Sequence, residues 1–189
     1  GARVRAWLPD GGDLEVPRGA RLAFEELPAA LSVRGVHGGV DGRIVGGDAR
    51  LADVGPVTLG AVGRMLDAAG VAGALDVGTV GGHARVAGVG GDARLRTVGG
   101  SVRLADVQGD VEAAAGGSAT VIQTPRAGGT YRVTAGGSVR WLSPDAPSAA
   151  LSAVAGGRVR VEVSGAAHAT GAPGGRHEFV LGDGGATIE

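Results

Sequence analysis

A nine-residue unit that opens on two glycines repeats along the chain, and it restricts the fold more than any other feature of the sequence. Residues 81–89, 90–98 and 99–107 are three consecutive copies, and residues 46–54 form an earlier one. Each copy reads Gly-Gly, then a polar residue, then Ala or Val, Arg, and Leu or Val, and it ends on Val. Further glycine pairs begin at Gly116, Gly128, Gly136, Gly156, Gly174 and Gly184. The repeat therefore covers about residues 33–189, and we expect the later copies to carry longer turns.

Within a copy, the alternation of apolar and polar residues is typical of a short, half-buried strand. The glycine pair followed by Asp or Ser predicts a tight turn, in which glycine adopts positive φ and the polar side chain bonds the backbone two residues on. Such a strand cannot bury its apolar face alone, but stacking at about 4.8 Å pairs every strand with the copies above and below it. The sequence therefore predicts an all-β fold, a single-stranded parallel β-solenoid (β-helix).

The dimensions follow from the length of the repeat. Nine residues cannot close a coil around a filled interior, so we expect two nine-residue rungs, about 18 residues, per coil; three rungs and a triangular section are the alternative. This gives about eight coils in a rod about 40 Å long, of undetermined handedness. Aromatic residues make up 3% of the chain and Gly 39 of its 189 residues, so an interior of Ala, Val and Leu is expected. A large ring would wedge the two sheets apart.

Residues 1–32 do not follow the repeat and are expected to form N-terminal capping strands, ahead of one continuous solenoid over residues 33–189. Trp7 and Phe24 lie in this first segment and are candidates to cover the first coil. At the other end, the last copy, residues 184–189, stops in mid-strand. This end predicts either further rungs or a partner strand, and hence a homo-oligomer formed by end-to-end or edge strand pairing.

Several classes of function find no support in the composition. Eighteen basic residues, all Arg, and nineteen acidic ones give a net charge of −1, so no nucleic-acid partner is expected. The chain has no Cys and no run of 18 apolar residues, which leaves no thiolate metal site and no transmembrane segment.

Metal and cofactor sites are not expected either. Calcium-binding parallel rolls need Gly at the fourth and Asp at the sixth position of the repeat, where this chain has Ala or Val and Leu or Val. The third-position residues Asp48, Asp92 and Asp110 are therefore interpreted as turn formers. The four His residues lack the spacing of a zinc site. The carboxylate pairs Glu25/Glu26 and Asp106/Asp110 leave a sugar-cleaving β-helix enzyme as an alternative, but long loops and aromatic sugar platforms are missing, and we expect no enzyme.

Arginine at the fifth position of the repeat is the surface pattern that stands out. With two rungs per coil, positions 18 apart stack, so Arg85 is expected over Arg103 and Arg94 beside Glu112. An outward ladder of guanidinium groups can bind anionic polysaccharide or lipid head groups by bidentate contacts. The alternative is a solvated face that keeps an apolar rod soluble and blocks edge pairing. The candidate residues are Arg50, Arg85, Arg94, Arg103, Arg132, Arg140 and Arg160.

The run of Gly-Gly-Asp/Ser-Val-Arg-Leu rungs, with Pro17 and Gly19 after the opening strand, resembles the bacterial adhesin-like family of β-strand repeat proteins and, more distantly, the bactofilins. The resemblance covers most of the chain. It implies a stacked β-solenoid, often attached to membrane or envelope proteins, with no catalytic residue to carry over.

The expected function is therefore a non-enzymatic structural or adhesive module of the bacterial envelope, in the cell envelope or outside the cell. Self-assembly through the ends of the rod is part of this expectation, and an envelope component or an anionic polysaccharide is its expected partner.

Overall fold

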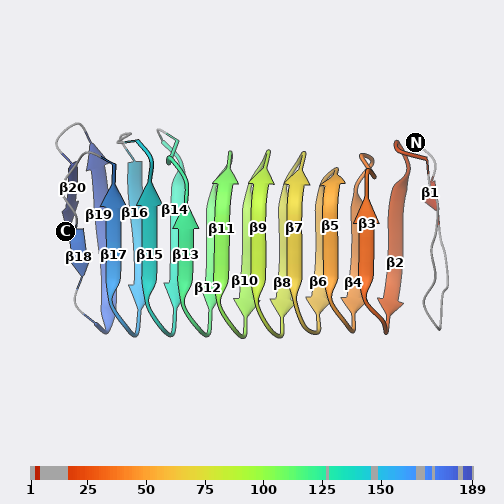
Figure 1. Cartoon of the computed structure of the whole chain (residues 1–189), viewed down its shortest axis with the longest axis horizontal. Helices are drawn as coiled ribbons and strands as arrows, with labels where there is room; N and C mark the ends of the chain where they lie inside the picture. Colours follow the sequence, from red (N-terminus) through yellow and green to blue (C-terminus); the bar gives the residue numbers. More distant parts are fainter. Residues whose placement is uncertain are drawn as a thin grey trace.

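A computed structural model of the chain shows two long β-sheets that face each other along a rod (Figure 1). The structure describes residues 3–4, 17–126, 128–145, 149–164, 169–171, 173–182 and 185–188. No helix that could cross a membrane occurs among them. The predicted all-β solenoid is confirmed, since over residues 21–163 the chain alternates between two stacked sheets, called the even sheet and the odd sheet after the numbers of most of their strands.

The even sheet has eleven strands in the order β1-β2-β4-β6-β8-β10-β12-β14-β16-β19-β20. Its strands are β1 (Arg3–Val4), β2 (Arg21–Leu27), β4 (Val40–Val45), β6 (Val57–Val62), β8 (Leu75–Val80), β10 (Ala93–Val98), β12 (Val111–Ala115), β14 (Thr130–Ala135), β16 (Ala149–Ala155), β19 (Gly175–Gly182) and β20 (Gly185–Ile188). The odd sheet has nine strands in the order β18-β17-β15-β13-β11-β9-β7-β5-β3. Its strands are β3 (Leu31–Arg34), β5 (Ala49–Val54), β7 (Leu66–Val71), β9 (Ala84–Val89), β11 (Val102–Val107), β13 (Ala119–Ile122), β15 (Val139–Ser143), β17 (Val159–Val163) and β18 (Ala169–Gly171).

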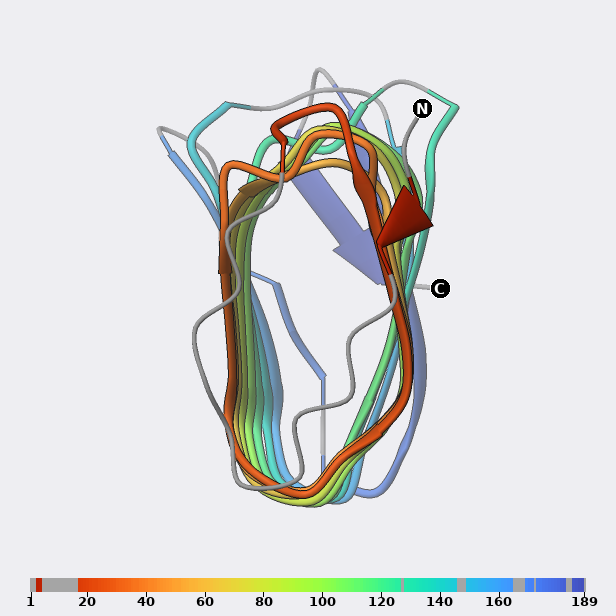
Figure 2. The same ribbon diagram turned by 90° about the vertical axis from the view of Figure 1, so that its right-hand side faces the viewer.

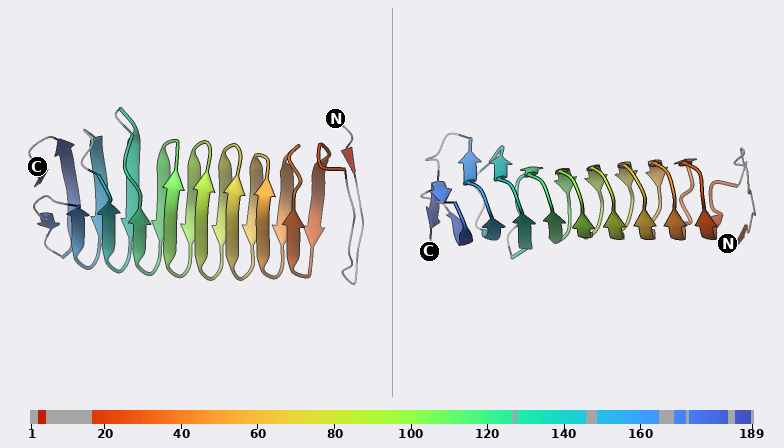
Figure 3. Two further views of the ribbon diagram at one scale, coloured as in Figure 1. Left: turned by 45° about the horizontal axis from the view of Figure 1, so that its top comes forward. Right: turned by 90° about the horizontal axis from the view of Figure 1, so that it is seen from below.

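Two rungs make one coil, as the repeat predicts. From β2 to β17 the chain alternates between the sheets and completes eight coils, with all neighbouring strands parallel (Figures 1 and 3). Val102 pairs with Ala84, 18 residues earlier, whereas Val139 pairs with Ala119, 20 residues earlier. Seen along the rod, the coils form a flattened loop, and the chain after β13 and β15 leaves the outline of the earlier coils at one end (Figure 2).

The interior is built from residues that alternate along each strand. Three positions of a typical rung are buried, as in β9, where Ala84, Val86 and Val89 are at most 2% exposed. The same positions of neighbouring rungs stack into columns of Ala, Val and Leu, so the strands bury a continuous core.

Two aromatic residues also lie inside, and here the expected exclusion of large rings is wrong. Tyr131 and Trp141 are 1% and 2% exposed, and their rings meet edge to face with centroids 5.4 Å apart. They lie in the part of the rod where one coil takes 20 residues instead of 18. Their register partners in the neighbouring coils are aliphatic, Val111 and Leu151 for Tyr131, and Val121 and Val161 for Trp141.

The N-terminal segment joins the solenoid earlier than expected. The boundary drawn after residue 32 falls inside β3, and β2 already pairs with β4 in parallel register. Phe24, at an inward position of β2, is half-buried against the core, and its ring fills the space that a Cβ atom on Gly42 would occupy. Phe24 thus packs over Gly42 of the neighbouring strand, while Trp7 lies outside the described residues.

The strands after β17 do not continue the parallel rungs that the repeat predicts up to residue 189. β18 runs antiparallel to β17, β19 antiparallel to β16, and β20 antiparallel to β19. The glycine pair at Gly174 therefore precedes a reversed strand and begins no solenoid rung; Gly184 lies outside the described residues. Inward and outward side chains alternate in both orientations, which is why the sequence pattern did not reveal the reversal.

Candidate functional site

The corners of the coil position every surface side chain, and two kinds of corner alternate. Even-to-odd corners contain Gly46, Gly63, Gly81, Gly99, Gly116, Gly136 and Gly156 at the first position. Here the backbone hydrogen bonds continue around the corner, as from Gly99 N to the Val80 carbonyl (2.8 Å) and from Gly100 N to the Gly82 carbonyl (2.8 Å).

The sequence was interpreted to place glycine at these corners because of positive φ, and this interpretation is wrong for the first glycine of each even-to-odd corner. None of the seven lies in the left-handed region, but a Cβ atom on any of them would lie 2.2–2.5 Å from a carbonyl oxygen of the preceding coil. Gly stands at these corners because the coils approach each other closely there.

The polar third position also has another role than expected. Asp48 Oδ1 accepts a hydrogen bond from Met65 N (3.3 Å), Asp92 Oδ1 from Asp110 N (3.1 Å) and Asp110 Oδ1 from Thr130 N (2.9 Å). Each of these bonds reaches the next coil, not the backbone two residues on. Ser101, Ser118 and Ser138 do the same at the even-to-odd corners (3.2–3.4 Å). The third-position carboxylates are therefore links between coils.

Histidine serves the same purpose at one corner. His83 Nδ1 accepts a hydrogen bond from Ser101 N at 2.9 Å. His177 lies in β19 with its ring against the backbone of Gly171, and His168 lies outside the described residues. No group of three or more potential metal ligands comes together in the part of the chain that the structure describes.

The candidate arginines divide between the two outer faces of the rod. Five share one column on the odd sheet, interrupted by Asp67 and Thr120, which gives the order Arg50, Asp67, Arg85, Arg103, Thr120, Arg140, Arg160. Arg94 and Arg132 lie on the even sheet, with Glu112 between them. The expected pairs Arg85 over Arg103 and Arg94 beside Glu112 are register partners, so this prediction is confirmed.

Most of these arginines face a carboxylate. Arg50 Nη2 lies 3.4 Å from Asp48 Oδ2. Arg140 and Arg160 both bind Glu162, at 3.0 and 2.5 Å. Exposed pairs of this kind contribute little to stability, about 0–1 kcal/mol each. These ion pairs matter more for binding, because the carboxylates neutralise guanidinium groups that would otherwise be open to an anionic ligand.

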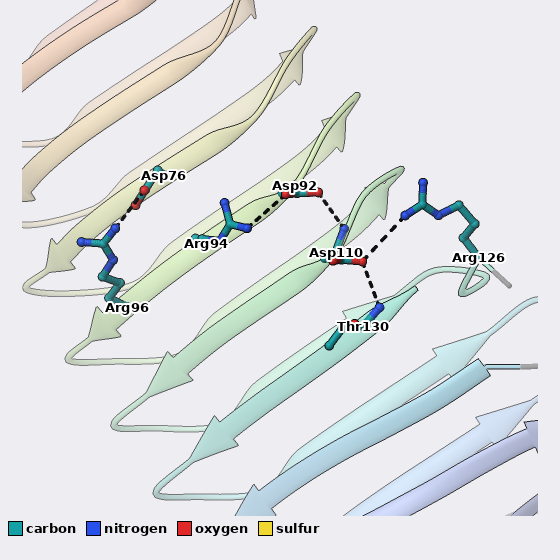
Figure 4. A network of polar contacts seen from close by, with 7 residues as sticks. All are labelled: Asp76, Asp92, Arg94, Arg96, Asp110, Arg126 and Thr130. Atoms are coloured by element: carbon teal, nitrogen blue, oxygen red, sulfur yellow. Dashed lines mark hydrogen bonds and ion pairs between the residues drawn. The ribbon is translucent and has the colours of Figure 1, made fainter. Parts of the chain in front are cut away.

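The even sheet carries its charges in alternation (Figure 4). Arg94 Nη2 lies 3.1 Å from Asp92 Oδ2, and Arg96 Nη2 lies 2.9 Å from Asp76 Oδ2 in the neighbouring coil. Asp110 holds Arg126 at 3.7 Å as well as the Thr130 amide. This face therefore resembles a network of compensated charges more than a binding surface for anions.

Nearer the N-terminus, the even sheet carries a further ion pair. The hydrogen bond from Arg21 Nε to Asp41, together with the attraction between the two charges, raises the pKa of Arg21 above its ordinary value.

Arg85 and Arg103 differ from the others. Both are exposed, they are partners on adjacent strands β9 and β11, and neither has a carboxylate within 4.0 Å among the described residues. Asp67 is the register partner of Arg85 on its other side but makes no ion pair with it. Arg132 likewise forms no ion pair in the described part, yet its neighbour in register is Glu112.

The carboxylate pairs considered for sugar cleavage have other surroundings. Glu25 and Glu26 are consecutive and exposed on β2. Asp106 takes a left-handed conformation (φ 53°) at the end of β11, and Asp110 is bound by Thr130 N and Arg126. Neither pair of carboxylates lines the cavity described next.

Sequence reasoning missed a small cavity beside the two buried aromatic rings. It has about 10 Å³ of free volume and is lined mainly by apolar side chains, among them Tyr131, Trp141 and Leu151. Trp141 Nε1 is buried and has no hydrogen-bond partner among the described residues, whereas the Tyr131 hydroxyl accepts a bond from Arg126 N at 2.7 Å. A space of this size holds at most one water molecule, so it is a packing defect and not a substrate pocket.

The resemblance to adhesin-like repeat proteins stays a prediction, because a comparison of the chain with protein-family models, curated proteins and solved structures finds no match in any of the three.

Proposed function

We propose that this chain is a non-enzymatic solenoid that works as a rigid spacer or adhesive surface in the bacterial cell envelope. The observation that supports it is the hydrogen bonding between successive coils, which runs through both sheets and continues around the even-to-odd corners. Bonds such as Gly82 N to the Arg64 carbonyl (2.7 Å) and Gly117 N to the Gly100 carbonyl (2.9 Å) join successive coils where loops would normally be free.

Such a stack resists bending because every coil is bonded to the next along two sheets and at the corners. Links by side chains add to this, as from Asp110 N to Asp92 and from Ser138 N to Ser118. The length of the rod grows by one strand spacing, about 4.8 Å, for each coil. A module built this way holds two attached parts at a fixed distance, which is the property a spacer needs.

The envelope location comes from the sequence resemblance and is tested in cells. The protein is tagged in the bacterium that carries its gene, and the cells are fractionated and treated with protease while intact. Recovery in the envelope or outside the cell is the expected result. Recovery in the cytoplasmic fraction alone would overturn this part of the proposal.

Stiffness is tested with spin labels, for which the chain is well suited because it has no cysteine. Ser32 and Thr120 stand in one outward column of the odd sheet, with Arg50, Asp67, Arg85 and Arg103 between them. Labels on Ser32→Cys and Thr120→Cys are thus five strand steps apart, about 24 Å before the label linkers are added. A single narrow distance distribution is expected, and a broad one would contradict a rigid spacer. A control pair on Arg50→Cys and Thr120→Cys should read one step shorter.

A further inference from the structure

We propose that Arg85 and Arg103 form a binding site for an acidic polysaccharide chain, of the uronic acid type, that lies along the rod on the outer face of the odd sheet. The proposal is independent of where the rod works in the cell, since it concerns the purified protein.

The first argument is the uncompensated charge. Like charges that face each other on adjacent strands are destabilising, and along this column the other arginines, Arg50, Arg140 and Arg160, each contact a carboxylate. Arg85 and Arg103 are neighbours in register without such a contact in the described part of the chain. An anion placed between them would remove their repulsion and gain two charge-assisted hydrogen-bond partners.

The second argument is the shape of the surface beside them. The next outward column of the odd sheet contains Ala69, Ala87 and Ala105, which are register partners in β7, β9 and β11. These methyl groups are too short to cover the guanidinium groups or to reach across to them. The arginines therefore stand beside a flat, weakly apolar strip on which a sugar ring can lie.

The third argument selects the ligand by its spacing. Successive arginines of the column are one strand apart, about 4.8 Å, which is close to the length of one sugar ring. A polymer of uronic acids carries a planar carboxylate on every ring, and guanidinium binds a planar carboxylate by two parallel hydrogen bonds. A chain that runs along the rod would therefore place one carboxylate at Arg85 and the next at Arg103.

The neighbours of the pair set the direction in which the site can extend. Asp67 repels an anion on the side of Arg85, whereas Thr120 on the side of Arg103 is neutral. Beyond Thr120 the column continues with Arg140 and Arg160, which share the single carboxylate of Glu162. The polymer is expected to continue from Arg103 toward Arg140, and its affinity to grow with its length.

The experiment measures binding of a short galacturonic acid oligomer to the purified chain by calorimetry, with a neutral glucose oligomer as ligand control. The test variant is Arg85→Gln with Arg103→Gln. The matched control is Arg94→Gln with Arg132→Gln, which removes the same charge from the opposite face. We expect the test variant to weaken binding about tenfold or more and the control to change it less than about twofold. Thermal unfolding of both variants, followed by circular dichroism, checks that the fold is kept.

A gain-of-function variant makes the test independent of any loss of stability. Thr120→Arg joins Arg103 to Arg140 in one continuous column and should strengthen binding several-fold. The proposal fails if the wild type does not bind the oligomer, if both double variants lose affinity equally, or if Thr120→Arg has no effect. Binding to vesicles of anionic phospholipid without binding to the oligomer would also overturn it, because the face would then be a membrane-binding surface.

Discussion

The carbonyl oxygen of Gly81 lies 2.4 Å from the point at which a Cβ atom on Gly99 would sit. The two glycines occupy the same corner position in successive coils, and a contact this short cannot be accommodated without movement of the backbone. Glycine thus recurs at this corner position because the coils stack too closely there to admit a Cβ atom.

We therefore expect Gly99→Ala to lower the free energy of unfolding by about 1–3 kcal/mol, the usual cost of forcing an extra carbon into a packed site. Chemical denaturation followed by circular dichroism measures it. Gly19→Ala is the matched control, because Gly19 has nothing within 4 Å of its added Cβ and no positive φ. The control should change stability by less than about 0.5 kcal/mol. Equal effects of the two substitutions would show that close stacking is not the reason for the corner glycine.

Another glycine is required by conformation and not by space. Gly88 has φ +66°, and the nearest atom to its added Cβ is 3.5 Å away. Its equivalents in the neighbouring odd rungs are Gly70 (φ +68°), Asp53 (φ 52°) and Asp106 (φ 53°). Asp enters the left-handed region more readily than Ala or Val, because its short polar side chain can bond locally.

The expected order of stability at this position is therefore Gly88, then Gly88→Asp, then Gly88→Ala, then Gly88→Val. Gly88→Ala should lower the free energy of unfolding by about 1–2 kcal/mol. Thermal and chemical unfolding of the three variants give the order. If the Gly88→Ala variant were as stable as the wild type, residue 88 would not take the left-handed conformation in solution.

Much of this architecture follows from the sequence, for physical reasons that particular residues make clear. The partnership of Arg85 with Arg103 needs only the repeat length and two rungs per coil. The positive φ at Gly70, Gly88 and Asp106 also has a signal in the sequence, since Gly or Asp stands at this position in each odd rung from β5 to β11.

Other features could not be derived from the repeat. β19 reads Gly-Arg-His-Glu-Phe-Val-Leu-Gly, without the alternation of the earlier rungs, and this pattern gives no strand direction from which its antiparallel pairing with β16 could be predicted. The burial of Tyr131 and Trp141 depends on how much room a 20-residue coil leaves, which is a property of the packed structure. The division of the arginines into compensated and uncompensated ones depends on the reach of side chains such as Glu162.

Removal of one whole coil tests the repeat as a structural unit. Deleting residues 84–101 takes out β9 and β10 and joins His83 to Val102, which follows the same kind of corner. Inward and outward positions stay in phase, and Arg103 comes to lie beside Asp67. We expect a folded rod that is shorter by one strand spacing, about 4.8 Å.

A deletion of half that length is the control. Without residues 84–92, every later strand moves to the opposite sheet, and Thr97 arrives at the position where Gly88 and Asp106 take left-handed conformations. This variant should unfold at a lower temperature than the whole-coil deletion. Equal stability of the two deletion variants would contradict the finding that two kinds of corner alternate along the rod.

The buried indole of Trp141 provides the last test, since its nitrogen has no hydrogen-bond partner in the part of the chain that the structure describes. A buried, unpaired N–H costs about 1–3 kcal/mol, so the indole stabilises the rod by its packing and not by its polar group. Trp141→Phe removes the unpaired group and keeps a ring against Tyr131, and we expect the free energy of unfolding to change by less than about 1 kcal/mol. Trp141→Ala loses the ring and enlarges the adjoining cavity, which should cost about 3–5 kcal/mol. Denaturant unfolding of both variants distinguishes these outcomes. A loss for Trp141→Phe as large as that for Trp141→Ala would mean that the indole nitrogen is bonded in solution, and the cavity would then be a site for an ordered water molecule.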